Sequence, residues 1–250
     1  MIIITGLGRC GTSFFLNLFK ESGFGVGNGL SFSDELRAGM EFAPAYSISR
    51  DMFTDHICQR DPVTDAEIYT GTIPIDLKID SSYWEEEISF RDKILRLDND
   101  TPPQKNDGFI EVIKDPRITW NPKIIRAWWE VRKDIKLIIL HRKPEDVIRS
   151  REEAGVRVDN NPNSFQDPKR RKDLRQFKED FSDFMTEILK LEIPYTLFFY
   201  PNFMHYDSSL IYSRLFNTLD IDMTKYGKVF NEVWNSLLNK DMISNFEEGN

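Results

Sequence analysis

The feature that most constrains the fold is a β-prone run at the N-terminus that leads through a glycine-rich turn into an apolar helix. Residues 2–5 read Ile-Ile-Ile-Thr, and residues 6–13 read Gly-Leu-Gly-Arg-Cys-Gly-Thr-Ser. From Phe14 to Ser22, apolar side chains recur at the spacing of one helix face. A strand, a glycine turn and a helix in this order predict a phosphate-binding loop. The glycines let backbone N–H groups approach an anion, and the helix N-terminus carries positive partial charge.

The cation of this loop stands at an unusual position. Gly6 and Gly11 have the spacing of the G-x-x-x-x-G-K-[ST] loop of nucleoside triphosphatases, yet Thr12 occupies the lysine position. Arg9 supplies a positive charge instead, two residues before Gly11. A glycine turn without a ligand is the alternative, because such turns are common in α/β proteins. The loop by itself leaves both interpretations open.

Strands and helices alternate along the rest of the chain. We expect further strands at 109–113, 136–141 and 195–200, and helices at 122–132, from 144 onward, and at 174–191, 207–219 and 225–238. This alternation predicts an α/β protein, with a P-loop-type three-layer fold in which helices flank a central, mainly parallel sheet. We expect residues 1–250 to form a single domain. Residues 28–108 and 156–176 should be elaborations of its core, with a loop over 28–45 and helices over 46–58 and 81–97.

The composition argues against several classes of protein. The chain has 33 basic and 41 acidic residues and a net charge of −8, whereas a non-specific nucleic-acid binder is normally basic. Two cysteines are too few for a disulfide scaffold and fit a reducing compartment. The longest apolar runs are too short to span a membrane, and no signal peptide precedes the first strand, so we expect a cytoplasmic location. The cysteines and three histidines are scattered, and no metal site is expected.

Two further motifs follow strands. Lys114-Asp115-Pro116-Arg117 comes after the strand at 109–113, and Arg142 comes after the strand at 136–141. Ser150 lies eight residues beyond Arg142, about two turns along the next helix, so both side chains can reach one phosphate. Ligands of parallel α/β folds bind at the carboxyl ends of the strands. We therefore expect both motifs to lie near residues 6–13, although charges that merely face water are the alternative for each motif taken alone.

Taken in this order, the motifs resemble those of a bacterial and phage-type family of sulfotransferases that use 3′-phosphoadenosine 5′-phosphosulfate (PAPS). The matching elements are Arg9-Cys10-Gly11-Thr12-Ser13, Gly39-Met40-Glu41-Phe42, Lys114-Asp115-Pro116-Arg117 and Arg142-Lys143-Pro144-Glu145-Asp146-Val147 with Ser150. The loop and the Lys-Asp-Pro element are also similar to those of protein-tyrosine sulfotransferases. The resemblance covers residues 1 to about 155. It departs at Cys10, usually Ser, at Met40, usually aromatic, and at Tyr200-Pro201-Asn202, where many relatives have Tyr-Glu-Asp.

The resemblance implies transfer of the sulfuryl group of PAPS to a hydroxyl, less readily an amine, of a glycan, small molecule or peptide, with adenosine 3′,5′-bisphosphate leaving. It implies that Cys10, Gly11, Thr12 and Ser13 hold the 5′-phosphate and that Arg142 and Ser150 hold the 3′-phosphate. Arg9 and Lys114 would neutralise charge on the leaving oxygen and the sulfuryl group. No metal is then required, because these cations do what Mg²⁺ does in kinases.

The resemblance also implies a general base near the acceptor, and the acidic candidates in the loop after the first helix are Asp34, Glu35 and Glu41. Glu41 matches the family element best, and Phe42 beside it would raise the pKa of the Glu41 carboxyl by desolvation. Glu35 is the second candidate, and a Glu41 that caps a helix or faces water is the alternative.

The basic cluster Lys169-Arg170-Arg171-Lys172 is a solvated helix start or a lid over the ligand. Cys10 as a reactive thiol is a further hypothesis, since a helix N-terminus lowers thiol pKa values.

Two other functions fit the same residues. A P-loop nucleotide kinase-like phosphotransferase would share the fold, but Thr12 replaces its lysine and no acidic metal-binding strand end is evident. A non-catalytic nucleotide-binding protein of the same fold is the other, because the Gly39-Met40-Glu41 element matches loosely. Titration with adenosine 3′,5′-bisphosphate and with ATP distinguishes these hypotheses.

Overall fold

In the computed structural model the first strand, the glycine turn and the first helix follow one another as the sequence predicts. The structure describes residues 1–26, 30–33, 38–42, 45, 47–49, 52, 58–60, 67–69, 78–81, 84–97, 111–120, 122–153, 174–220 and 223–239. None of the described helices combines the length and the apolar character that crossing a membrane requires.

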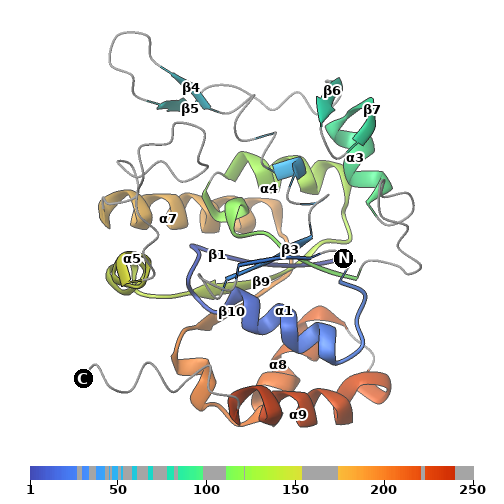
Figure 1. The fold of residues 1–250 in the computed structure, drawn as a ribbon, viewed down its shortest axis with the longest axis vertical. Coiled ribbons are helices and arrows are strands. Elements are labelled where there is room, and N and C mark those ends of the chain that lie inside the picture. Colours follow the sequence, from blue (N-terminus) through green and yellow to red (C-terminus); the bar gives the residue numbers. More distant parts are fainter. Residues whose placement is uncertain are drawn as a thin grey trace.

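The core of the fold is a four-stranded, fully parallel sheet (Figure 1). Its strands are β1 (Ile2–Gly6), β8 (Val112–Lys114), β9 (Lys136–His141) and β10 (Tyr195–Phe199), in the order β10-β9-β1-β8. The register pairs Ile4 with Lys114, Gly6 with Leu140, and Phe199 with His141. The predicted α/β class and the three-layer arrangement are confirmed. The carboxyl ends of all four strands therefore meet at one edge, where the charged motifs were expected.

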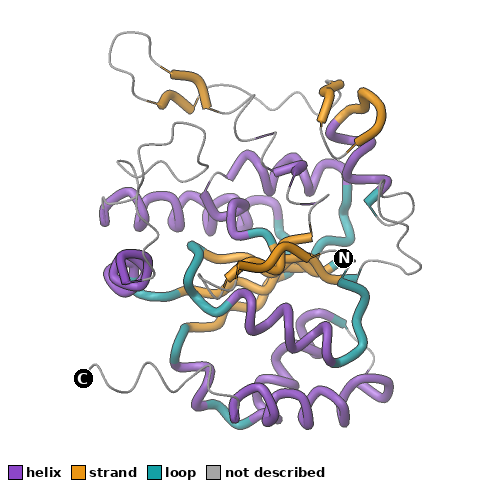
Figure 2. Tube along the Cα trace, in the orientation of Figure 1, coloured by secondary structure: helices purple, strands orange, loops and turns teal. Residues whose placement is uncertain are grey.

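Helices cover both faces of this sheet (Figure 2). On one face lie α1 (Thr12–Glu21), α8 (Ser208–Leu219) and α9 (Met223–Asn239); on the other lie α4 (Pro122–Val131) and α7 (Leu174–Leu191). Alternate strand residues feed two separate apolar clusters: Ile138 and Leu140 pack with α1, whereas Leu137 and Ile139 pack with α4 and α7. The continuous apolar runs of β1 and β9 follow from this burial on both faces. Helix α5 (Pro144–Glu153) begins directly after β9, at the carboxyl edge.

The elaboration at 28–108 differs from expectation because it contains hairpins. β2 (Leu30–Ser33) and β3 (Ala38–Phe42) pair where a loop was predicted, and β6 (Lys78–Ser81) pairs with β7 (Trp84–Ser89) where a helix was predicted. Helix α3 (Phe90–Arg96) starts only after β7, where Ser89 Oγ accepts the N–H of Asp92 at 3.1 Å. Residues 47–49 are helical, but β4 (Cys58–Arg60) pairs with β5 (Glu67–Tyr69) at the end of the predicted helix 46–58. Cross-strand pairing outweighs the local helix preference of glutamates 85–87.

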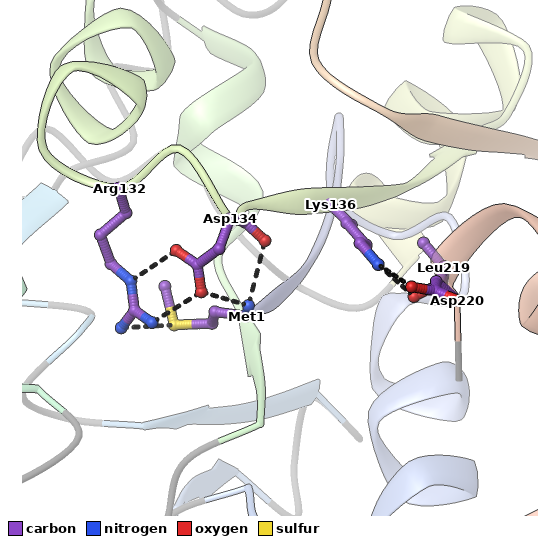
Figure 3. A network of polar contacts seen from close by, with 6 residues as sticks. All are labelled: Met1, Arg132, Asp134, Lys136, Leu219 and Asp220. Atoms are coloured by element: carbon purple, nitrogen blue, oxygen red, sulfur yellow. Dashed lines mark hydrogen bonds and ion pairs between the residues drawn. The ribbon is translucent and has the colours of Figure 1, made fainter. Parts of the chain in front are cut away.

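The amino edge of the sheet is held by a polar network (Figure 3). The Met1 ammonium lies 3.0 Å from Asp134 Oδ2, and Arg132 Nη2 lies 2.9 Å from the same oxygen. The hydrogen bond from Arg132, together with the N-terminal charge, keeps the pKa of Asp134 well below its usual value. Lys136 Nζ, at the start of β9, donates to the carbonyl oxygen of Leu219 at 2.7 Å. The ionic contacts of this edge stand at the opposite end of the strands from the predicted ligand site.

Candidate functional site

The turn between β1 and α1 has the backbone that its glycines predict. Gly8, Arg9 and Gly11 have φ angles of 81°, 55° and 87°. A Cβ on Gly6 would collide with the carbonyl oxygen of Leu140, and one on Gly11 would stand 3.1 Å from Tyr200 Cδ2. Gly11 is also the N-cap of α1, where it offers no side-chain cap to the first N–H groups of the helix. Such an N-terminus favours anions.

Arg9 is the exception in this turn, because it carries a side chain in the left-handed region. That conformation costs about 1–3 kcal/mol for a residue other than glycine and persists where the surroundings fix it. Two contacts do so: Arg9 Nε donates to Ser150 Oγ at 3.3 Å, and Arg142 Nη1 donates to the carbonyl oxygen of Arg9 at 3.0 Å. Ser150 is buried and lies on α5, and Arg142 lies between β9 and that helix. The structure thus brings the loop and the Arg142–Ser150 motif together.

Lys114 reaches the same loop from the neighbouring strand. It is the last residue of β8 and only 2% exposed, and its Nζ donates to Ser13 Oγ at 3.0 Å in the first turn of α1. The register of β8 against β1 produces this contact, because Lys114 pairs with Ile4, two residues before Gly6. Three cationic side chains from Arg9, Lys114 and Arg142 therefore surround the loop.

The two other charged residues of the Lys-Asp-Pro-Arg element, Asp115 and Arg117, are buried, so their charges do not face water. Asp115 is 0% exposed and Arg117 is 6% exposed, with Arg117 Nη2 2.9 Å from Asp115 Oδ1. The Thr5 hydroxyl donates to the carbonyl oxygen of Asp115 at 2.8 Å, and the Thr119 hydroxyl donates to that of Gly6 at 2.9 Å. These bonds join the end of β1 to the segment after β8. Neither threonine belongs to a recognisable motif, and sequence reasoning missed both.

Cys10 lacks the exposure and the lowered pKa that characterise reactive thiols. Its side chain is fully buried, and this desolvation raises the pKa of the Cys10 thiol to about 11, although a hydrogen bond with the Gly8 backbone and the charges of Lys114 and Arg142 act in the opposite direction. The expectation that the helix N-terminus lowers its pKa is wrong, because burial is the larger effect. At neutral pH the residue is a protonated thiol packed among the apolar side chains beneath the loop.

Two residues after neighbouring strands complete the described surroundings. Tyr200, which follows β10, has its ring centroid 5.0 Å from Arg142 Cζ, and burial raises the pKa of its phenol. His141, at the end of β9, packs against Phe181 and Phe199 with ring centroids 4.5 Å and 5.6 Å away. Burial lowers the pKa of His141 and favours a neutral imidazole. Sequence reasoning had noted Tyr200 only as a departure from the family pattern.

The structure describes the backbone of the candidate base Glu41 but not its side chain. Glu41 lies on β3, which contacts both β8 and α1, and it pairs with Ser31 of β2. The side chain of Glu41, all of Glu35, and the cluster Lys169–Lys172 lie outside the described residues. The assignments of these residues remain predictions.

The arrangement gathers the kinds of group that bind phosphate anions in proteins. An uncapped helix N-terminus, glycine-turn amides and three cationic side chains converge at the carboxyl edge of the sheet, and hydroxyls of Ser13 and Ser150 lie beside them. Charge-assisted hydrogen bonds of this kind are the strong contacts in phosphate sites. In comparisons with known proteins, no protein-family model matches this chain, and neither does any curated protein.

Proposed function

We propose that the chain is a sulfotransferase that moves the sulfuryl group of PAPS to a hydroxyl, less readily an amine, of an acceptor. The observation that carries this proposal is the contact between two motifs 141 residues apart, Arg9 Nε to Ser150 Oγ at 3.3 Å. The hydrogen bond from Arg142 Nη1 to the Arg9 carbonyl oxygen, at 3.0 Å, is a second contact between the same two motifs and supports the proposal further. A nucleotide with phosphates at both the 3′ and 5′ positions of one ribose needs two such binding elements side by side.

The residues of the candidate site have distinct roles in this proposal. The turn amides of residues 10–13 and the N-terminus of α1 would hold the 5′-phosphate. Arg142 and Ser150 would hold the 3′-phosphate. PAPS itself supplies a sulfuryl group activated by its phosphate leaving group. Arg9 stabilises negative charge on that leaving group, and Lys114 stabilises charge on the sulfuryl oxygens, in a position already fixed by its bond to Ser13.

Nucleotide preference tests the proposal directly. We expect adenosine 3′,5′-bisphosphate to bind at least roughly tenfold more tightly than 5′-AMP, a difference of about 1.4 kcal/mol, because only the former carries the 3′-phosphate. Arg142→Ala and Ser150→Ala should remove most of this difference. Isothermal titration calorimetry measures both affinities. Equal affinities in the wild-type protein would overturn the proposal.

Removal of divalent metal separates this function from a kinase-like one. We expect the conversion of PAPS to adenosine 3′,5′-bisphosphate to keep its rate in EDTA, because the side chains of Arg9 and Lys114 supply the positive charge that Mg²⁺ supplies to kinases. Chromatography of the released nucleotide gives the rate. A rate that vanishes in EDTA and returns with Mg²⁺ would favour the phosphotransferase. Tight binding of the bisphosphate without turnover on any hydroxyl acceptor would favour the non-catalytic nucleotide-binding protein.

A further inference from the structure

Two side chains from outside the turn lie beside residues 9 and 11 of the turn. Arg142, after β9, donates to the carbonyl oxygen of Arg9 at 3.0 Å. Tyr200, after β10, lies where Gly11 has no side chain, 3.1 Å from the position of a Cβ on that glycine. Arg142 and Tyr200 also contact each other, with the guanidinium carbon 5.0 Å from the ring centroid. Arg142 thus joins the Arg9 carbonyl to the Tyr200 ring, which lies beside Gly11 together with the Phe203 ring.

Arg142 and Tyr200 thus flank the part of the turn whose residues adopt positive φ angles, a conformation that residues other than glycine rarely adopt. Gly8, Arg9 and Gly11 all have positive φ angles, and a residue such as Arg9 keeps that conformation only where neighbours fix it. A peptide unit is planar, so a bond that fixes the Arg9 carbonyl also fixes the direction of the next N–H group. Tyr200 keeps Arg142 in place through the ring face, and its phenol, whose pKa partial burial raises further above the usual value, is neutral. The Arg142 bond therefore fixes the direction of the Cys10 N–H group, and the Tyr200 ring supports it by holding Arg142 in place.

We infer that Arg142 and Tyr200 are positioning residues that hold residues 8–11 in their anion-binding geometry in the ligand-free protein. Arg142 then supports the 5′-phosphate end of the site as well as the 3′-phosphate end. The identity of the two phosphates rests on the proposed function, but the effect on the turn does not. Loss of either side chain loosens the turn even when nothing is bound.

Hydrogen exchange of the ligand-free protein tests the effect on the turn. Arg142→Lys keeps the charge but loses the planar, forked guanidinium, and Tyr200→Leu keeps an apolar contact but loses the aromatic face. We expect the amides in peptides that span residues 6–13 to exchange roughly fivefold faster or more in both variants. Unchanged exchange in both variants would overturn the inference.

The chain offers a matched control for these variants. Arg214 of α8 makes the same pair of contacts: its guanidinium carbon is 4.9 Å from the Phe198 ring centroid, and its Nη2 donates to the carbonyl oxygen of Leu197 at 3.1 Å. Neither partner belongs to the glycine turn. Arg214→Ala should leave exchange over residues 6–13 at the wild-type rate, and the same acceleration in this control would attribute the effect to general loosening and overturn the inference.

Binding of 5′-AMP tests the functional consequence. This ligand lacks a 3′-phosphate, so an Arg142 that only binds that phosphate would leave its affinity unchanged in Arg142→Lys. We expect 5′-AMP to bind roughly fivefold more weakly or worse, which is within the usual range of coupling between sites. The double variant Arg142→Lys/Tyr200→Leu should be no weaker than the weaker single variant, because both residues act on the same turn.

The two proposals fail separately in these measurements. Unchanged affinity for 5′-AMP in Arg142→Lys would overturn the positioning role and leave the sulfotransferase proposal intact. Equal wild-type affinities for 5′-AMP and adenosine 3′,5′-bisphosphate would overturn the sulfotransferase proposal, whereas faster exchange over residues 6–13 would still support the positioning role. Calorimetry and exchange are both measured on the full chain.

Discussion

Replacing Lys114 with methionine is expected to lower the turnover number of sulfuryl transfer roughly 10²–10³-fold, the usual cost of removing one preorganised charge-stabilising donor. Lys114 is 2% exposed, and its Nζ is bonded to Ser13 at the start of α1. Water screens a charge poorly at such a site, so its effect on developing negative charge is large. Methionine keeps an unbranched chain of similar length without the charge. Turnover is measured at saturating PAPS, so that weaker binding does not lower the value.

Lys136→Met is the matched control. Lys136 is also a strand lysine with a partly buried Nζ, but it begins β9 and donates to the carbonyl oxygen of Leu219 at the opposite edge of the sheet (Figure 3). Its loss should lower the free energy of unfolding by about 1 kcal/mol, the net value of one hydrogen bond, and leave turnover unchanged. Wild-type turnover in Lys114→Met would show that Lys114 only holds Ser13 and has no part in the reaction.

The sheet and its covering helices could be predicted because the burial of each element requires a local pattern of apolar residues. β1 and β9 are buried on both faces, so they read as continuous apolar runs, and α4 and α7 repeat apolar residues at helical spacing. The chain then alternates strand and helix, and this alternation gives a parallel sheet. Each of these signals lies within one segment and needs no knowledge of its partners.

The hairpins of the 28–108 elaboration lacked such a signal. Residues 84–89 contain three consecutive glutamates, which favour a helix when considered alone, yet Ile88 pairs with Ile79 of β6. Strand preference depends on the neighbouring strand more than on the residue itself. Ile79 lies nine residues before Ile88, and the sequence between them contains no glycine motif that would signal the pairing, so local patterns misassigned the segment.

The residues of the candidate site also fall into those that the sequence predicted and those that it did not. Arg9, Lys114, Arg142 and Ser150 could be expected at one edge because parallel strands end together, and the structure brings them there. Their chemical roles remain predictions. Thr5, Thr119 and Tyr200 could not be found, because their contacts with Asp115, Gly6 and Arg142 arise only from the packing of distant segments. The burial of Asp115 with Arg117 likewise depends on the register of β8 against β1.

Replacing Glu41 with glutamine is expected to lower the turnover number roughly 10²–10⁴-fold, the usual range for loss of a general base. A hydroxyl acceptor must lose its proton as the new S–O bond forms, and a carboxylate near the sulfuryl group can take it. Glu41 lies on β3, whose backbone contacts β8, the strand that carries Lys114. Glutamine keeps the size and hydrogen-bonding capacity of the side chain and removes only the ability to accept that proton.

Affinity for adenosine 3′,5′-bisphosphate separates loss of the base from loss of the site. It should stay within about twofold of wild type in Glu41→Gln, because the proposed nucleotide contacts come from the glycine turn, Arg142 and Ser150. The turnover of Glu35→Gln, the second candidate in the same elaboration, should remain near wild type. Near-full turnover in Glu41→Gln with an inactive Glu35→Gln would move the base to Glu35. If both variants stay active, neither carboxylate of this pair accepts the proton, and the base is another residue.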